Sequence, residues 1–175
     1  MTRILLFILV GSSNKYDTSE IRHYLNGTET FNNIGFLQKA FTQVAINKIE
    51  NTSVDNSEQS TFGTGETPST NQYACGNTTD KIFLLSEKEV TIAEYGFGAY
   101  NAQDAARLRK PTDYAKATGI SVDSTYSICW WWLRSPHFSN SDSARNVYSN
   151  GDALHSNVVS GTYRGVVPVL SISFQ

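Results

Sequence analysis

The sequence predicts an α+β domain, with short helices early in the chain and short twisted antiparallel strands and long loops late. Before residue 45, apolar residues recur at spacings of three and four, which is typical of amphipathic helices. After residue 128, short alternating runs are divided by Asn-Gly and Ser-Gly pairs, which favour hairpins. Helices that precede strands, rather than alternate with them, favour α+β over a parallel βαβ layout.

Two helices are expected in the first 45 residues. The segment 17–20 offers N-cap residues before an apolar stripe that ends at Asn26-Gly27, a typical C-terminal stop. A second helix is expected over residues 34–44, with Phe36, Leu37, Ala40 and Phe41 facing inward.

The middle of the chain is expected to hold one long loop between short elements. Residues 46–54 alternate weakly, as a strand does, and residues 55–79 are polar and aperiodic, which indicates a functional or mobile loop. Residues 81–85 form a short apolar run and are expected to be a buried strand. Ser86 and Glu89 then have the spacing of a capping box. Helices are expected over residues 102–109 and 111–117.

The densest apolar block is Ile128 to Leu133, which contains three consecutive tryptophans. In an extended strand Trp130 and Trp132 share one face and Trp131 takes the other, and at least one face must be core. We expect Trp130 and Trp132 to be mostly buried. Arg134 then either links loops through backbone carbonyls or a carboxylate, or anchors a ligand. Pro136 ends the block, and the closing apolar strand, residues 165–172, contains Pro168, which favours a sheet edge or a bulge.

Composition limits the possible functions. The 175 residues suffice for one domain with a core. The net charge is -2 and only 17% of residues are charged, so non-specific nucleic-acid binding is not expected. The 12% aromatic content disfavours disorder. Ser, Thr and Asn make up 51 residues (20, 17 and 14), a composition common outside the cytoplasm.

The apolar start of the chain has two interpretations. Residues 1–14 are expected to be an N-terminal apolar strand ended by Gly11, or else the remnant of a signal segment, and residues 15–175 a single domain. The run Ile4 to Val10 is too short to span a bilayer, so no transmembrane span is expected.

No catalytic, metal or cofactor motif stands out. His23, His137 and His155 occur in no metalloprotease pattern, and neither a nucleophile elbow nor a nucleotide-binding glycine loop is present. Asp142 and Asp152 could form the carboxylate pair of a glycan-active enzyme, although turn-forming roles are the simpler interpretation. We therefore expect no cofactor, no metal and no enzymatic activity.

The segment His137 to Arg164 has the composition of an adaptable binding surface. Its 28 residues include six Ser, four Asn, two Tyr, two His and two Asp, but no Lys, Glu, Gln or Trp. Mutation at the adenines of Asn codons yields this set of residue types and never Lys or Glu. An ordinary polar hairpin surface explains it equally well. The candidate ligand-binding residues, expected to be solvent-facing on one side, are His137, Phe138, Asn140, Asp142, Asn146, Tyr148, Asn150, Asp152, His155, Asn157 and Tyr163.

Several motifs in order resemble a bacterial and phage family of domains of unknown function, over roughly Lys15 to Ser173. They include Cys75 to Ser86, Arg109 to Ala115, the W-W-L-R-S-P motif at Trp131 to Pro136 and Gly165 to Leu170. Two departures are Val167, where the family more often has Arg, and a shorter strand before Lys15.

The resemblance implies a C-type-lectin-like fold, in the version shared with formylglycine-generating enzymes and retroelement variable proteins. There, a core Trp/Arg strand supports a C-terminal display surface. The active cysteines of the formylglycine enzymes and the calcium motifs of lectins are not matched, so neither activity is implied. The resemblance also places Cys75 and Cys129 near two strands; if these strands are neighbours, the cysteines could form a disulfide, and otherwise they are small buried hydrophobes.

Together these expectations describe a ligand-binding or display module for an unknown protein or glycan. Its polar C-terminal surface could be diversified by a retroelement. The alternatives are a glycan-active enzyme using Asp142 and Asp152, or a purely structural domain of a surface or phage protein. The expected location is extracellular, at the cell surface or on a phage particle.

Overall fold

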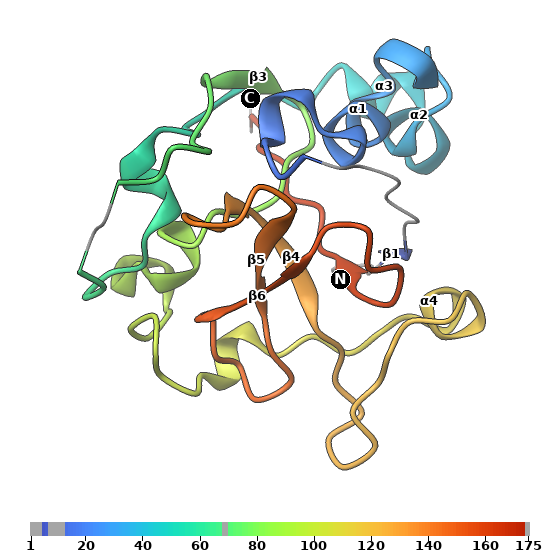
Figure 1. Cartoon of the computed structure of the whole chain (residues 1–175). Helices are drawn as coiled ribbons and strands as arrows, with labels where there is room; N and C mark the ends of the chain where they lie inside the picture. Colours follow the sequence, from blue (N-terminus) through green and yellow to red (C-terminus); the bar gives the residue numbers. More distant parts are fainter. Residues whose placement is uncertain (1–4, 7–12, 68–69, 174–175) are drawn as a thin grey trace.

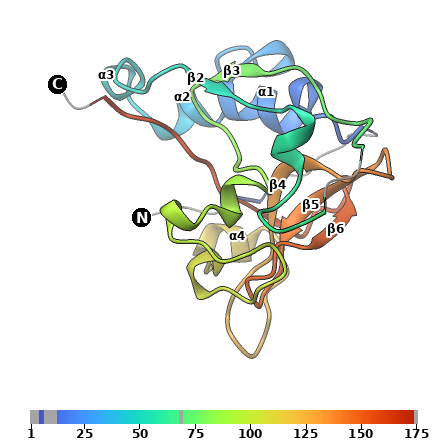
Figure 2. The same cartoon turned by 90° about the vertical axis from the view of Figure 1, so that its left-hand side faces the viewer.

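The computed structural model describes residues 5–6, 13–67 and 70–173, and it confirms a mixture of short helices and open sheets. The α-helices are α1 (Glu20–Asn26), α2 (Phe36–Ala40), α3 (Gln43–Ile46) and α4 (Asp113–Ala117). The strands are β1 (Leu5–Leu6), β2 (Thr52–Val54), β3 (Thr78–Asp80), β4 (Trp131–Pro136), β5 (Ser143–Val147), β6 (His155–Val158) and β7 (Gly165–Val166). In Figures 1 and 2, α1–α3 and the β2–β3 pair lie at one end and the larger sheet lies below them.

Local capping signals position the helices. The Ser19 side chain accepts a hydrogen bond from the Arg22 N–H, and Gly27 ends α1 with φ at +67°, a conformation that glycine adopts without strain. The Thr112 side chain caps α4 in the same way, through the N–H of Ala115. Both helices agree with the prediction.

The predicted helix over residues 34–44 is wrong in its length. Phe41 is extended, with φ at -131°, and Thr42 starts a new cap, so the segment divides into α2 and α3. Leu37 is buried, whereas Phe36 and Phe41 are only partly buried and pack edge to face, 6.0 Å apart. The predicted helix over 102–109 is also shorter, a single 3-10 turn at Ala105–Arg107.

A five-stranded sheet in the order β1-β7-β4-β5-β6 forms the centre of the domain. β4 pairs antiparallel with β5 and parallel with β7, and β5 and β6 form an antiparallel hairpin. β1 pairs with β7 through Leu5 and Leu6, and the rest of the predicted N-terminal strand lies outside the described residues. β2 and β3 make a separate two-stranded sheet.

The predicted strands at residues 81–85 and 165–172 are largely not formed: apart from β7, these segments contain only isolated bridges. Pro168 has no N–H, so β7 stops at Val166 and pairing resumes only as the Phe83–Val169 and Ile49–Ile172 bridges. Ile82, Phe83 and Leu84 are nevertheless buried, as predicted for this run. The capping box is confirmed on the 3-10 turn that follows: the backbone N–H groups of Ser86 and Glu89 each donate to the other's side chain.

The two faces of β4 belong to two different cores. Trp132 packs in one cluster with Tyr16, Leu25 and Val166, below α1. Trp131 is fully buried in the other cluster, and its indole N–H donates to the Arg107 carbonyl at 3.0 Å. This confirms that consecutive tryptophans face opposite sides, and Trp130, just before β4, is less completely buried than Trp131 and Trp132.

Arg134 has the linking role that the sequence offered as one of two alternatives. Its buried guanidinium donates to the carbonyls of Leu84 and Asp55 at 2.6 and 2.9 Å, and pairs with Glu89 at 2.5 and 3.0 Å. It also reaches the side chain of Asn56. Arg134 therefore joins two segments, at residues 55–56 and 84–89, to the central strand, which is a structural role.

The possible disulfide between Cys75 and Cys129 is not formed, and both thiols are free. Cys75 packs against the cluster below α1, whereas Cys129 is buried in the cluster on the opposite face of the sheet. Burial raises the pKa of the Cys129 thiol to about 12. Cys129 is therefore a small buried hydrophobe, the second interpretation that the sequence allowed.

Candidate functional site

Three aromatic rings stack in series where β4 begins, β5 ends and β6 begins. Tyr148 lies between Trp130 and His155, with ring centroids 4.1 and 4.2 Å away and interplanar angles of 26° on both sides. All three side chains are half-buried. We call these three residues the aromatic ladder.

Strand register brings the ladder together. Trp131 pairs with Val147, so Trp130 and Tyr148 lie side by side on one face of the sheet. Asn146 pairs with both Trp132 and His155, which places the next row of residues on that same face. A shift of one residue in the β5 register would move Tyr148 to the other face and dismantle the stack.

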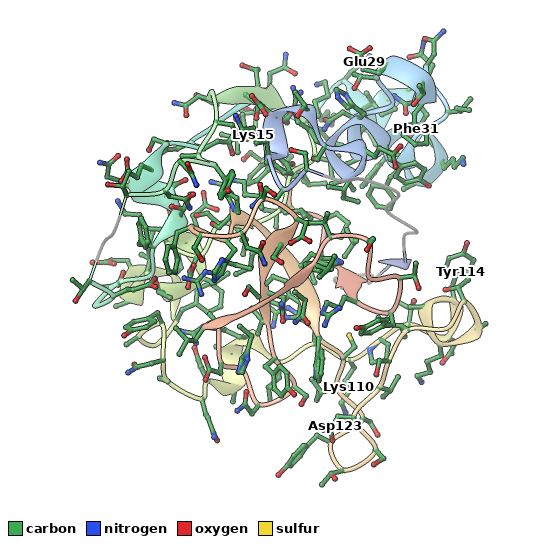
Figure 3. All side chains as sticks on the ribbon, in the orientation of Figure 1. Lys15, Glu29, Phe31, Lys110, Tyr114 and Asp123 are labelled. Carbon is green, nitrogen blue, oxygen red and sulfur yellow. The ribbon has the colours of Figure 1, made fainter. Side chains whose placement is uncertain are left out.

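The β5–β6 hairpin tip holds polar groups beside the ladder. Gly151 has φ at +84°, and its N–H donates to the Tyr148 carbonyl, as the Asn-Gly signal predicts for a tight turn. The carboxylate of Asp152 lies 3.9 Å from His155 Nε2. Asp123, in the loop that projects below the sheet in Figure 3, accepts a hydrogen bond from Ser149. The tip therefore offers acceptors beside aromatic rings.

Arg164 lies against the ladder from the β7 side. Its guanidinium carbon is 5.3 Å from the Trp130 ring centroid, 5.0 Å from that of Trp132 and 4.5 Å from that of Tyr163. These distances are within the range of cation–π attraction. Tyr163 is 44% exposed, so it forms the outer edge of this group.

The prediction that Asn146 faces solvent is wrong. Its side chain is fully buried between Trp132 and His155, and neither amide atom has a hydrogen-bond partner in the described part of the chain. The residue type suggested exposure, but its position in a central strand decided its burial. Of the eleven predicted residues, only Asn140 and Tyr163 are classed as exposed, and the other nine except Asn146 are half-buried.

The predicted surface residues also form two groups rather than one. Tyr148, Asn150, Asp152, His155 and Tyr163 gather at the ladder end. His137, Phe138, Asn140 and Asp142 lie at the β4–β5 turn, where the rings of His137 and Phe138 stack 4.7 Å apart. Asn157 lies on β6 opposite Ala144, between the two groups.

This arrangement separates Asp142 from Asp152. Asp142 precedes β5, whereas the Asp152 carbonyl bonds the N–H of Tyr148, beyond the other end of that strand. Six residues of extended chain correspond to about 20 Å. Glycosidases need their two carboxyl groups within about 5–10 Å. The geometry therefore does not support the carboxylate-pair alternative.

A buried charge cluster on the opposite face was missed by the sequence analysis. Arg145 lies 3.0 Å from Glu66 and 2.8 Å from Glu87, and Glu87 is fully buried. Burial raises the pKa of Glu87 to about 8, even though Arg145 opposes the shift. Nothing in the pattern around Glu87 distinguishes it from a surface glutamate; only the alternation along β5 placed Arg145 inward.

A cavity of about 270 Å³ lies on the ladder's side of the sheet, between α1 and β4. Asn14, Tyr16, Ser19 and Glu20 line it on the helical side, and Trp132 and Ala144 on the sheet side. Trp132 therefore lines the cavity and also contacts Arg164, which lies against the ladder.

Two further properties concern only the described residues. Residues 13–67 and 70–173 bring no three His, Cys, Asp or Glu side chains together in a way that could hold a metal ion. Among the helices described, none has the length and apolar character needed to cross a bilayer.

Comparison with known proteins places the chain in one family. Residues 9–174 match the model of a domain of unknown function, DUF6273, so the chain belongs to that family. No curated protein and no solved structure matches the chain. The comparisons reveal no enzymatic family or homologue.

Proposed function

We propose that this DUF6273 domain is a binding module that holds a glycan against the aromatic ladder and Tyr163. The observation that carries the proposal is the series of stacked rings, Trp130, Tyr148 and His155, at a half-open end of the sheet. The partly open edge of this stack, together with the exposed Tyr163, combines rigid apolar rings with nearby polar groups, which suits a sugar, because a sugar has both apolar C–H faces and hydroxyl groups.

The surroundings of the ladder favour a glycan over a protein partner. Two polar groups lie in the turn beside the stack: the Asp152 carboxylate, 3.9 Å from His155 Nε2, and the Asn150 side chain, which accepts a hydrogen bond from the Asp152 N–H. A protein interface of standard size would need a broad apolar centre. Among the described residues from β6 to β7 and in the turn before β6, the large exposed apolar side chains are Leu154, Val158 and Tyr163, at 43, 47 and 44% exposure. A polar ligand that contacts a few rings fits this surface better.

The lectin-like fold and the display role belong to the same proposal. They are supported by a central Trp/Arg strand, β4, whose neighbours β5 and β6 carry the candidate surface. We propose that any retroelement diversification acts on the accessible Asn positions, such as Asn140, Asn150 and Asn157, and spares the buried Asn146. An adjacent reverse-transcriptase gene with a template repeat would support this role.

The proposed origin is a bacterial or phage protein, acting outside the cell or on a particle. The charge-poor composition, rich in Ser, Thr and Asn, supports this location. The competing function is that of a purely structural domain, in which the ladder would only stabilise the fold and would bind no ligand.

A glycan-array screen with the full chain tests the proposal. We expect binding to at least one saccharide class, and we expect Tyr148→Ala and His155→Ala to weaken it at least about tenfold, because each removes one ring of the stack. Tyr114→Ala is the matched control, since Tyr114 is 63% exposed on α4, away from the sheet in Figure 3. Folded ladder variants that bind as well as the parent chain would contradict the proposal.

A further inference from the structure

Arg164 differs from the other described arginines in having neither a carboxylate partner nor a hydrogen-bond acceptor among the described residues. Arg22, Arg107, Arg134 and Arg145 each pair with a carboxylate, and Arg109 donates to backbone carbonyls. Arg164 is only 1% exposed, and no described ion pair includes it. Its Nε and Nη1 atoms are buried without a hydrogen-bond partner among the described residues.

A buried cation without an anion is unfavourable, and the three rings around Arg164 offset only part of this. Such groups are normally paired, so the missing partner points to a ligand.

Two more unpartnered polar groups lie in the same part of the sheet face. Trp132 Nε1 and both amide atoms of Asn146 are buried and make no hydrogen bond within the described chain. Trp132 and Asn146 are directly paired across β4 and β5, and the Trp132 ring is the one that Arg164 covers at 5.0 Å. Gly161 lies close to Arg164 Nη1, so the loop after β6 covers the group. We call Trp132, Asn146 and Arg164 the polar cluster.

The atoms of the polar cluster define what it would recognise. Four of its unpartnered atoms are donors, namely Arg164 Nε and Nη1, Trp132 Nε1 and Asn146 Nδ2, and one is an acceptor, Asn146 Oδ1. A donor-rich set around a guanidinium suits an anion, and a planar carboxylate matches the planar guanidinium and can be held by two parallel hydrogen bonds. The remaining acceptor suits a hydroxyl.

We propose that the polar cluster is a carboxylate-binding subsite, and that the glycan bound at the ladder carries an acidic sugar. The inference rests on the proposed function, because the ladder supplies the stacking surface beside the subsite. The half-buried Trp130 and the exposed Tyr163 both contact Arg164, and the proposal requires the acid to approach the guanidinium between these two rings. Sugar carboxylate and sugar hydroxyl then occupy the donors and the acceptor of the cluster.

The test compares an acidic sugar with its uncharged isostere. Glucuronate and N-acetylneuraminate, each paired with its carboxamide, are titrated into the full chain and followed by NMR. We expect each acid to bind at least about tenfold more tightly than its amide, since hydrogen bonds between charged groups are the strong ones. Arg164→Gln should abolish the difference. Asn146→Asp should also abolish it, because it places a negative charge beside the carboxylate.

Arg109→Gln is the matched control. Arg109 also covers a tryptophan, Trp131, at 5.5 Å, but on the other face of the sheet. The Arg109→Gln variant should therefore keep the preference for the acid over its amide.

Equal binding of acid and amide would overturn the carboxylate subsite while leaving the ladder proposal standing. A preference for the acid that survives in folded Arg164→Gln would also overturn it, as would the absence of binding by both acids. A parallel titration compares a short peptide that has a free C-terminus with its amide. A preference seen only there would overturn the assignment to a sugar. If folded Tyr148→Ala and His155→Ala both bind the glycan as well as the parent chain, this result would instead contradict the proposed function itself.

Discussion

Replacing Arg134 with methionine removes the group that links two segments, residues 55–56 and 84–89, to β4. The change deletes hydrogen bonds to the carbonyls of Leu84 and Asp55 and leaves Glu89 without its ion-pair partner. Breaking a buried ion pair by removing one partner typically costs about 3–5 kcal/mol. Glu89 is 27% exposed and can regain water, so we expect the lower end, about 3 kcal/mol. In a domain of this size that lowers Tm by about 6–12 °C.

Differential scanning calorimetry measures this effect, with Lys116→Met as the control. Lys116 pairs with Asp113 on the surface of α4, with side chains 51 and 100% exposed, so its removal should leave Tm almost unchanged. The double variant Arg134→Met/Glu89→Gln should lose less stability than the sum of the single variants, because the two residues interact directly. An Arg134→Met protein that melts within about 2 °C of the parent would refute the linking role.

Three further predictions follow from the described contacts. The raised pKa of Glu87, about 8 against 4.5 for the free side chain, means that the folded state holds a proton that the unfolded state releases. Stability should therefore fall as pH rises from about 5 to 8, and urea denaturation of Glu87→Gln should lose that dependence. Gly151→Ala should lower Tm clearly more than Gly119→Ala: both have positive φ, but only at Gly151 would the new Cβ overlap a backbone atom, the Asp104 carbonyl oxygen. Both cysteines should be alkylated in unfolded protein without prior reduction, as shown by intact mass.

Local signals in the sequence were sufficient for the caps and the tight turns. Three of these features depend on residues only three or four positions apart: the Ser19 cap, the Gly27 stop and the Ser86/Glu89 capping box. A short segment of sequence is therefore enough to predict their geometry. The opposite faces of Trp131 and Trp132 follow from alternation alone. These features needed no knowledge of the rest of the chain.

Pairing partners and polar burial could not be obtained in this way. Residues 81–85 have the composition of a strand, but their main partner is a single residue, Val169, about 85 positions later. Asn146 and Arg164 have residue types that favour the surface, and both are buried by neighbours that only the tertiary fold supplies. The sequence indicated the segment that holds the candidate site, residues 137–164, whereas the unpartnered polar atoms of the site can be identified only from the three-dimensional structure.

The three adjacent tryptophans provide the most direct measurement of the central claim, that a ligand binds on the ladder's face of the sheet. Each indole N–H gives its own NMR signal, and Trp131 reports on the opposite face, where it donates to the Arg107 carbonyl. On titration with a glycan that the chain binds, the account predicts that the Trp130 and Trp132 indole signals shift while that of Trp131 stays in place. A shift at Trp131 alone, or no shift in any of the three, would contradict it.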